Sequence, residues 1–360
     1  MSSYTIPIGP VHVVLEEPIY FKLQVEGETV TGVDINAGHV HRGIEFLAMQ
    51  RNFYQNITLT ERVCSLCSNN HPFTYCMAVE KIAKISLPAR AEYLRTIADE
   101  IKRVASHLFN IGMTAHIVGF DSLFMHVMEL RETMQDLKEC VFGNRMNLSV
   151  NCIGGVRYDI DDEQSKYIIK TLDELKKPLA EITKIYKKDK SIRRRTEGVG
   201  ILPEDKAVEY GVVGPVARGS GVNNDVRVEN PYMAYDKIKV NAVVYKNGDA
   251  YSRLLVRLGE VAESIRVLEE CMKVLPKGPV NLNYIPDIPA GEAIAKSEAP
   301  RGELIYYARS NGSEIPERIK WRVPTYPNWE ALKVMMPGSK IADIPVIIGS
   351  IDPCISCTER

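Results

Sequence analysis

Two Cys-x-x-Cys pairs stand near opposite ends of the chain. The first is Cys64-Ser-Leu-Cys67, with His71 four residues on, and the second is Cys354-Ile-Ser-Cys357, close to Arg360. A pair with this spacing lets two sulfurs point at one ion from a tight turn, and thiolates favour soft or borderline metals. A single tetrathiolate metal site would therefore tie the two ends of the chain together.

Other uses of paired thiols stay open at this point. Zinc ribbons usually place their two pairs about 15–20 residues apart, whereas nearly the whole chain separates these two. A structural zinc knot that staples the two ends of the fold remains an alternative on spacing alone. Thioredoxin-like redox chemistry is disfavoured, because no β-α-β unit surrounds either pair.

A catalytic metal needs more than its ligands. It requires a polar shell, a proton relay and an open coordination position. The sequence offers five polar candidates, which are Glu17, Glu45, His71, Arg301 and Asp352. Two further histidines, His39 and His41, lie two residues apart, and we favour hydrogen-bonded histidines on a strand or loop over metal ligands.

Composition and charge narrow the class of protein. The chain has 360 residues, of which 45% are hydrophobic and 25% charged, and a net charge of -1. Bulk electrostatics therefore imply neither nucleic acid nor an anionic membrane surface as a partner. No apolar run reaches the roughly 18 residues that span a bilayer, and the first residues lack the pattern of a signal peptide. We therefore expect a soluble, intracellular protein.

The eight cysteines are too few for a secreted disulfide scaffold. Metal binding in a reducing compartment is the better interpretation of the two pairs. We expect the four remaining cysteines to be small core residues. These are Cys76, Cys140, Cys152 and Cys271.

The hydrophobic pattern predicts an α+β fold that is predominantly helical. Alternation over 18–26 and 29–35 predicts an N-terminal β-hairpin. Apolar residues spaced three and four apart predict long helices. The first of these helices begins near Pro88, with Ser86 as a cap. Three more cover 121–142, 162–188 and about 251–274. A loop-rich region at 196–250 is clearest at Gly211 to Gly221, and strands are predicted at Gly302 to Tyr307 and Pro345 to Ile348.

No repeat, low-complexity tract or flexible linker interrupts the chain, so we expect one compact body. Its three regions are an N-terminal α/β part at 1–60, a helical core at 61–200 and a mixed part at 201–360. Each of the last two regions carries one cysteine pair.

Five motifs carry a resemblance to a known family. They are Arg42-Gly-Ile-Glu45, Arg62 to His71, Ala299-Pro300-Arg301-Gly302, Val323-Pro324-Thr325 and Asp352 to Arg360. Along nearly its whole length the chain resembles the large, catalytic subunit of nickel-iron hydrogenases. Interior segments resemble the membrane-bound, energy-converting (Ech-like) group of that family and the related quinone-site subunit of respiratory complex I. These include Arg218 to Val222, Asp225-Val-Arg227 and Gly248 to Arg253.

The resemblance implies roles at the metal. Cys64, Cys67, Cys354 and Cys357 would hold nickel, and Cys67 and Cys357 would also bridge to an iron that carries cyanide and carbon monoxide. Arg301 would lie over the open metal position, with Asp352 hydrogen-bonded nearby. Thr325 and the backbone around Ala299-Pro300 would donate to the cyanides.

The resemblance also implies a proton relay and tuning groups. Glu17 would take the first proton from Cys354, with Glu16 as a competitor for this role. His71 would hydrogen-bond a cysteine sulfur, and Glu45 would bind or support a structural magnesium. Arg360 stands where many soluble relatives have a magnesium-binding histidine, which counts against the magnesium. Ser106 replaces a second acid often found near the open position.

The function implied is reversible H2 oxidation and proton reduction. Because this chain has no further cysteine cluster, its electrons would pass through iron-sulfur clusters of a small partner subunit. In the energy-converting group ferredoxin is the electron partner, and complex-I-like membrane subunits couple the reaction to ion translocation. The chain would then lie peripherally on the cytoplasmic side of the cell membrane in an anaerobic organism. The alternative is a non-catalytic subunit of a complex-I-like quinone oxidoreductase that holds structural zinc.

Overall fold

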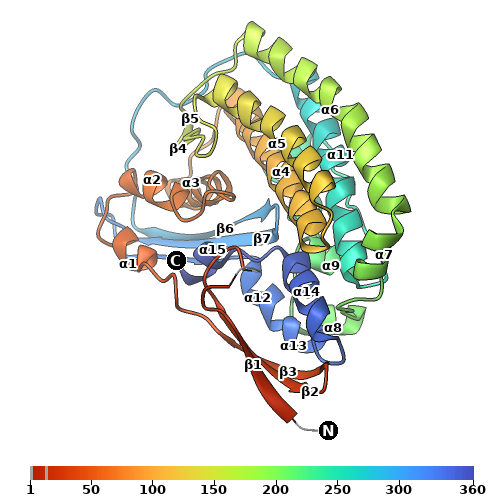
Figure 1. The fold of residues 1–360 in the computed structure, drawn as a ribbon. Coiled ribbons are helices and arrows are strands. Elements are labelled where there is room, and N and C mark those ends of the chain that lie inside the picture. Colours follow the sequence, from red (N-terminus) through yellow and green to blue (C-terminus); the bar gives the residue numbers. More distant parts are fainter. Residues whose placement is uncertain (1–2, 13–14) are drawn as a thin grey trace.

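Four long helices form the largest layer of the protein in the computed structural model, which describes residues 3–12 and 15–360 (Figure 1). They are α4 (Ala89–Ile117), α5 (Asp121–Phe142), α6 (Asp162–Lys188) and α11 (Ala250–Val274). Each buries apolar residues that recur three and four apart, such as Ile97 and Ile101 on α4. Asp161 caps the start of α6 in a capping box with Gln164, and Asp249 caps α11.

Two three-stranded antiparallel sheets lie below this helical layer in the view of Figure 1, in the orders β1-β2-β3 and β6-β7-β8. In β2 the apolar side chains are buried and alternate with exposed polar ones, as expected for a half-buried strand. A further short pair, β4-β5, lies beside α3 and α4. The strands are β1 (Ser3–Ile8), β2 (Tyr20–Glu26), β3 (Thr29–Asn36), β4 (Asn151–Cys152), β5 (Gly155–Val156), β6 (Gly291–Ala299), β7 (Gly302–Ser310) and β8 (Arg318–Arg322).

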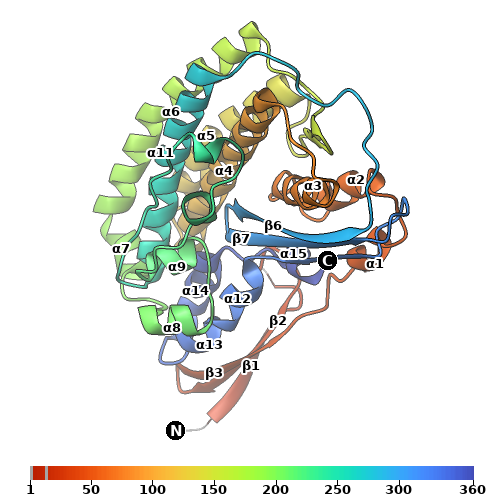
Figure 2. The same cartoon turned by 180° about the vertical axis from the view of Figure 1, so that it is seen from behind.

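Shorter helices connect these layers, and one of them, α3, covers a face of β6 and β7 (Figure 2). They are α1 (Ile44–Ala48), α2 (Gln55–Glu61), α3 (Asn70–Ala83), α7 (Lys190–Thr196), α8 (Glu204–Glu209), α9 (Pro215–Gly219), α10 (Val226–Glu229), η1 (Met233–Asp236), α12 (Thr325–Glu330), α13 (Leu332–Met335), η2 (Ile341–Asp343), α14 (Ile344–Ile351) and α15 (Ile355–Glu359). In both views the C-terminal helix α15 lies close to α1, so segments from the two ends of the chain meet.

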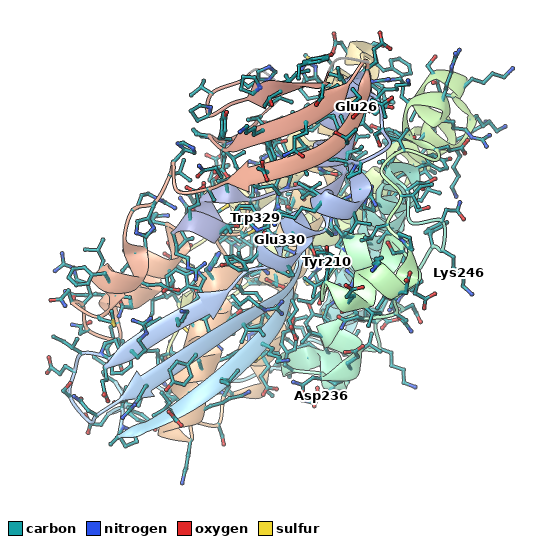
Figure 3. All side chains as sticks on the ribbon, turned by 90° about the horizontal axis from the view of Figure 1, so that it is seen from below. Glu26, Tyr210, Asp236, Lys246, Trp329 and Glu330 are labelled. Carbon is teal, nitrogen blue, oxygen red and sulfur yellow. The ribbon has the colours of Figure 1, made fainter. Side chains whose placement is uncertain are left out.

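The hydrophobic core has two parts. The larger part joins the long helices to α3 and β6–β8, and it includes all four paired cysteines. The smaller part lies between the β1–β3 sheet and helices α12–α14, and it includes Phe21 and Trp329. Figure 3 shows α12, which carries Trp329 and Glu330, between the two sheets. The cysteines therefore lie in the interior rather than at a surface edge.

The β6–β7 hairpin turns on only two residues. Ala299 pairs with Gly302, so Pro300 and Arg301 form the turn itself. Gly302 has φ +126°, and Gly214, with φ +68°, packs directly against the Arg301 carbonyl. Both positions need glycine, because a side chain is disfavoured at these angles and has no room there. The turn is therefore held firmly, with Arg301 at its tip.

The structure confirms the predominantly helical α+β fold. The predicted hairpin corresponds to β2 and β3, and the predicted helices at 121–142, 162–188 and 251–274 correspond to α5, α6 and α11. The predicted strand at Gly302 to Tyr307 lies within β7.

Other local predictions were wrong. Pro345 to Ile348 was predicted as a strand but lies in helix α14. The prediction failed because a short apolar run has no period that distinguishes a buried strand from a buried helix. Gly211 to Gly221 includes the short helix α9, with Pro215 at its first position. No side chain caps α4, so Ser86 does not have that role.

The free cysteines also depart from expectation. Cys76 and Cys271 are buried as predicted, but Cys140 is exposed and Cys152 is only partly buried. Cys140 lies on the solvent side of an amphipathic helix, where a small residue is tolerated whatever its polarity.

The packing of Gly214 predicts a difference between two glycine substitutions. Gly214→Ala should lower the free energy of unfolding by more than about 3 kcal/mol, because it combines backbone strain with a clash against the Arg301 turn. Gly211→Ala is the matched control, since Gly211 also has positive φ (+62°) but open space around it, and it should cost about 1 kcal/mol. Urea unfolding of the two variants measures the difference, and equal losses would show that the turn does not depend on this contact.

Candidate metal centre

The four paired thiols converge in the interior. Cys64 and Cys67 lie in the turn between α2 and α3, Cys354 caps the start of α15, and Cys357 lies in α15. All four are buried, and their Sγ atoms lie within 4.8 Å of one another. Sulfurs bound to one metal at about 2.3 Å lie no more than about 4.6 Å apart, so the set fits a metal with almost no rearrangement. Among the described residues, no other cluster of metal-binding side chains was found.

The thiols interact strongly with one another. The Sγ of Cys354 lies 3.2 Å from that of Cys64 and 2.9 Å from that of Cys357. Hydrogen bonds from Cys354 and Cys357 lower the pKa of Cys64 to about 7, and the same bonds lower the pKa of Cys67. Burial raises the pKa of Cys357, and bonds to Cys64 and Cys67 raise the pKa of Cys354. Within the set, the first pair therefore ionises more readily than the second, and thiolate is the form that binds metal.

Arg301 reaches across the thiols from the hairpin turn. Its Nη1 lies 3.4 Å from the Cys67 Sγ and 3.3 Å from the Ser106 Oγ. Its Nε donates to the Asp352 carbonyl at 2.8 Å, and its Nη2 to the Asp352 Oδ1 at 2.6 Å. Burial opposes its charge, but Asp352 and the thiols hold the pKa of Arg301 well above its usual range. A fixed cation is thus placed beside the sulfurs.

His71 lies beside another of the thiols, in the first turn of α3. Its Nε2 is 3.2 Å from the Cys357 Sγ, and its Nδ1 is 2.7 Å from the Tyr306 hydroxyl. Burial lowers the pKa of His71 to about 4, so the ring is neutral and has one N–H. With the Tyr306 hydroxyl donating to Nδ1, the remaining N–H points at the sulfur.

Thr325 and the Ala299-Pro300 segment also border the site. Thr325 begins α12, and its Oγ1 accepts from the Cys354 amide at 3.0 Å. Ala299 ends β6, and Pro300 is the residue before Arg301 in the turn. Thr325 therefore lies beside Cys354, whereas Ala299 and Pro300 adjoin Arg301 in the turn.

Two adjacent carboxylates line a small cavity next to the second cysteine pair. Glu16 and Glu17 border about 30 Å³ of space together with Met113, Pro353 and Ile355. The Glu17 Oε2 accepts from the Ser356 amide at 2.8 Å, and burial raises the pKa of Glu17. Glu16 is more exposed to solvent than Glu17, yet desolvation of its carboxyl, with repulsion from Asp352, raises its pKa to about 7.

Glu45 faces an arginine at the end of the chain. Its Oε1 accepts from the Arg360 Nε at 2.9 Å, and the Arg360 guanidinium lies over the Trp321 ring. Because a guanidinium already neutralises this carboxylate, the geometry favours an ion pair over a magnesium ion at Glu45. His39 and His41 lie in the preceding loop, and His41 Nδ1 bonds the Glu359 carbonyl at 2.5 Å.

Two residues that hold the cysteine segments in place were not assigned a role from the sequence. Arg42 donates to the Val63 carbonyl at 2.7 Å and to the Ser356 carbonyl at 3.1 Å, so it joins the two segments. Lys102, which is buried in α4, donates to the Ser65 carbonyl at 3.0 Å. Arg42 belonged to a recognised motif. For Lys102, the signal that could have indicated a role was a lysine within an apolar helical pattern.

The fold and the site together define a protein that can hold a metal between the two ends of its chain. Two family models match the sequence. The respiratory-chain NADH dehydrogenase 49 kDa subunit matches residues 118–286 and 282–360, and the nickel-dependent hydrogenase family matches residues 42–112.

Individual proteins agree with these models. The carbon monoxide-induced hydrogenase of Rhodospirillum rubrum is 60% identical over 100% of both chains. The membrane-bound hydrogenase subunit alpha of Pyrococcus furiosus is 38% identical over 99% of this chain and 87% of its own length. A solved structure of an archaeal membrane-bound sulfane sulfur reductase matches with a TM-score of 0.94 and 32% identity, covering 99% of this chain and 98% of its own.

The chain belongs to the family that joins nickel-dependent hydrogenases with the 49 kDa subunit of respiratory NADH dehydrogenase. Within this family it is a hydrogenase subunit, an oxidoreductase that acts on hydrogen. The alternative of a non-catalytic, complex-I-like subunit has less support. Its relatives include subunits of membrane-bound complexes, while no helix of residues 3–12 and 15–360 has the length and apolar character to cross a bilayer.

The raised pKa of Glu16 predicts a pH dependence of stability in the metal-free protein. The folded pKa of about 7 exceeds the ordinary value of 4.5, so the folded state holds this proton more tightly than the unfolded state. Stability gained from Glu16 is therefore present at low pH and is lost as the pH rises through about 7. Solvent screening limits the effect to about 1 kcal/mol.

The measurement compares urea unfolding of the wild type and of Glu16→Gln between pH 4.5 and about pH 8, a range that includes the ordinary and the raised pKa. The wild type should lose stability relative to the variant across this window, because the amide does not ionise. Parallel curves would show that the Glu16 carboxyl is solvated as an ordinary surface acid.

Proposed function

We propose that this chain is the catalytic subunit of an energy-converting nickel-iron hydrogenase that interconverts H2 with protons and electrons. The observation that carries the proposal is the set of four buried thiols within 4.8 Å, with Arg301 beside Cys67. Only a metal centre gives a reason to bury four thiols and a guanidinium at one point. Membership of the hydrogenase family makes nickel the natural occupant.

The four cysteines would hold the centre in two roles. Cys64 and Cys354 would be terminal ligands of nickel, and Cys67 and Cys357 would bridge nickel to iron. When bound, such a centre supplies the splitting of H2 and the exchange of its two electrons, and iron would carry cyanide and carbon monoxide. Thr325 lies beside Cys354, and it and the backbone around Ala299-Pro300 would donate hydrogen bonds to the cyanides.

Arg301 and Asp352 would shape the open side of the centre. The guanidinium is held by two bonds to Asp352, so its remaining Nη1 stays directed at the sulfurs. A planar, permanently charged group in this place can polarise H2 as it arrives. His71 would donate to the Cys357 sulfur and lower the electron density that this sulfur gives to the metals.

Glu17 would carry the proton away from Cys354. Its carboxylate lies at the second cysteine pair, bonded to the Ser356 amide, and borders a small cavity. A carboxyl with a raised pKa holds a proton more readily, so it can accept a thiol proton and pass it on. Glu16, which borders the same cavity, is the competing candidate.

Electrons would enter and leave through partner subunits. We infer a small iron-sulfur subunit close to the centre, ferredoxin as the soluble electron carrier, and complex-I-like membrane subunits that couple the reaction to ion translocation. The names of the relatives, a membrane-bound hydrogenase subunit among them, support this assembly. The chain would then be peripheral to the membrane, on its cytoplasmic side.

Metal analysis of the purified complex tests the proposal. We expect about one nickel and one iron at the four thiols, with infrared bands of cyanide and carbon monoxide. Cys357→Ser should lose metal and all H2 activity, because a hydroxyl is a poor bridging ligand for soft metals. Cys140→Ser, which changes an exposed thiol outside the site, should keep both. Zinc alone in the wild type would overturn the proposal in favour of the structural alternative.

The proton path is tested by two neighbouring variants in one H/D exchange assay. Glu17→Gln should leave nickel, iron and the infrared bands intact but reduce exchange at least about 100-fold, because an amide cannot carry the proton. Glu16→Gln should be nearly silent. A dead Glu16→Gln with an active Glu17→Gln would transfer the role to Glu16, and two active variants would show that the proton leaves by another route.

A further inference from the structure

Arg257, on α11, is a buried arginine without a carboxylate partner at ion-pair distance among the described residues. Its Nη1 donates to the Arg253 carbonyl at 3.2 Å, and its Nε has no hydrogen-bond partner. Leaving a guanidinium buried and unpaired costs several kcal/mol. Because packing alone does not require a charge here, we looked to the groups around Arg257 for its role.

The surroundings of Arg257 point to the end of α14. That helix packs against α11, and Arg253, one turn before Arg257, donates from Nε to the Ser350 Oγ at 2.9 Å. Arg257 lines a cavity of about 10 Å³ with Gly349 and Ser350, which is room for about one water. Asp352 ends α14, so the partial negative charge of the helix end and the Asp352 carboxylate both lie on this side.

The other carboxylate that acts on Arg257, Glu260, is already engaged. Glu260 follows Arg257 by one helical turn, but its Oε1 accepts from the Arg218 Nε and its Oε2 bonds the His107 Nε2, both at 2.8 Å. Asp352 is different, because its Oδ1 binds Arg301 while its buried Oδ2 has no partner. Among the carboxylates, Asp352 also opposes most strongly the lowering of the Arg257 pKa that burial causes.

We propose that Arg257 is a positioning residue for the metal centre, which attracts the free Oδ2 of Asp352 and so keeps Oδ1 on Arg301 and Arg301 beside the thiols. Arg257 acts through Asp352, directly or by way of one water in the small cavity. It also adds a second buried positive charge on the side of the centre where Arg301 lies. This inference rests on the proposed function and deepens it, since it adds a residue to the frame of that site.

The experiment uses the intact hydrogenase complex with Arg257→Gln and Arg257→Lys. Arg257→Gln should retain nickel and iron, shift the cyanide and carbon monoxide bands because the local field changes, and lower kcat about 10–100-fold with little change in KM for H2. Arg257→Lys keeps the charge but not the fork, so its bands should return toward the wild-type positions while kcat stays reduced.

The matched control is Arg95→Lys. Arg95 is an equally buried arginine on α4, but it is paired with Glu80 at 2.6 Å and bonds the Cys152 and Gly155 carbonyls. That variant should lose stability without moving the bands or lowering kcat.

If Arg257→Gln does not fold, Arg257→Lys still tests the inference, because a wild-type kcat in that variant would refute the positioning role. Unshifted bands and normal kcat in Arg257→Gln would overturn this inference alone, whereas a wild type without any such bands would overturn the proposed function.

Discussion

Burying four thiols within 4.8 Å of one another is the constraint on which the rest of this structure depends. The pairs come from opposite ends of the chain, so the fold has to close both ends over one point. Arg42 performs part of this closure by bonding carbonyls of both segments, and the Arg360–Glu45 ion pair performs another part. The neighbouring thiols lower the pKa of Cys67 most, and the positive charge of Arg301 beside it lowers that pKa further.

A network of buried charges continues from this site into the helical layer. Arg218 bonds Glu260 on α11 at 2.8 Å and Glu298 on β6 at 2.9 Å, so it ties a long helix to the strand that leads to Arg301. Because each of these groups would be costly if left alone, the pairs specify one relative placement of helix and hairpin. The Pro300-Arg301 turn is then fixed by the ion pair at Glu298 on the strand that precedes it and by the close packing of Gly214 against it.

The same fold occurs in proteins that are named for different functions. A hydrogenase is 60% identical to this chain, and a sulfane sulfur reductase complex contains a chain that superimposes with a TM-score of 0.94. The backbone therefore does not decide the reaction, and the side chains at the junction of the two ends do. In this chain those side chains are four thiols, one guanidinium and the acids Glu16, Glu17 and Asp352, which together are suited to a metal that exchanges protons and electrons.

The sequence by itself determined the long helices, the N-terminal hairpin and the thiol set, because period and residue spacing are local properties of the chain. Recognised motifs also placed Arg301, His71 and Thr325 near the cysteines. Only the tertiary structure decided that Pro345 to Ile348 is helical, that Arg360 neutralises Glu45 and that Arg257 faces the end of α14. Those outcomes depend on which distant segments pack together, and burial, counter-charges and unpaired atoms exist only after the chain has folded.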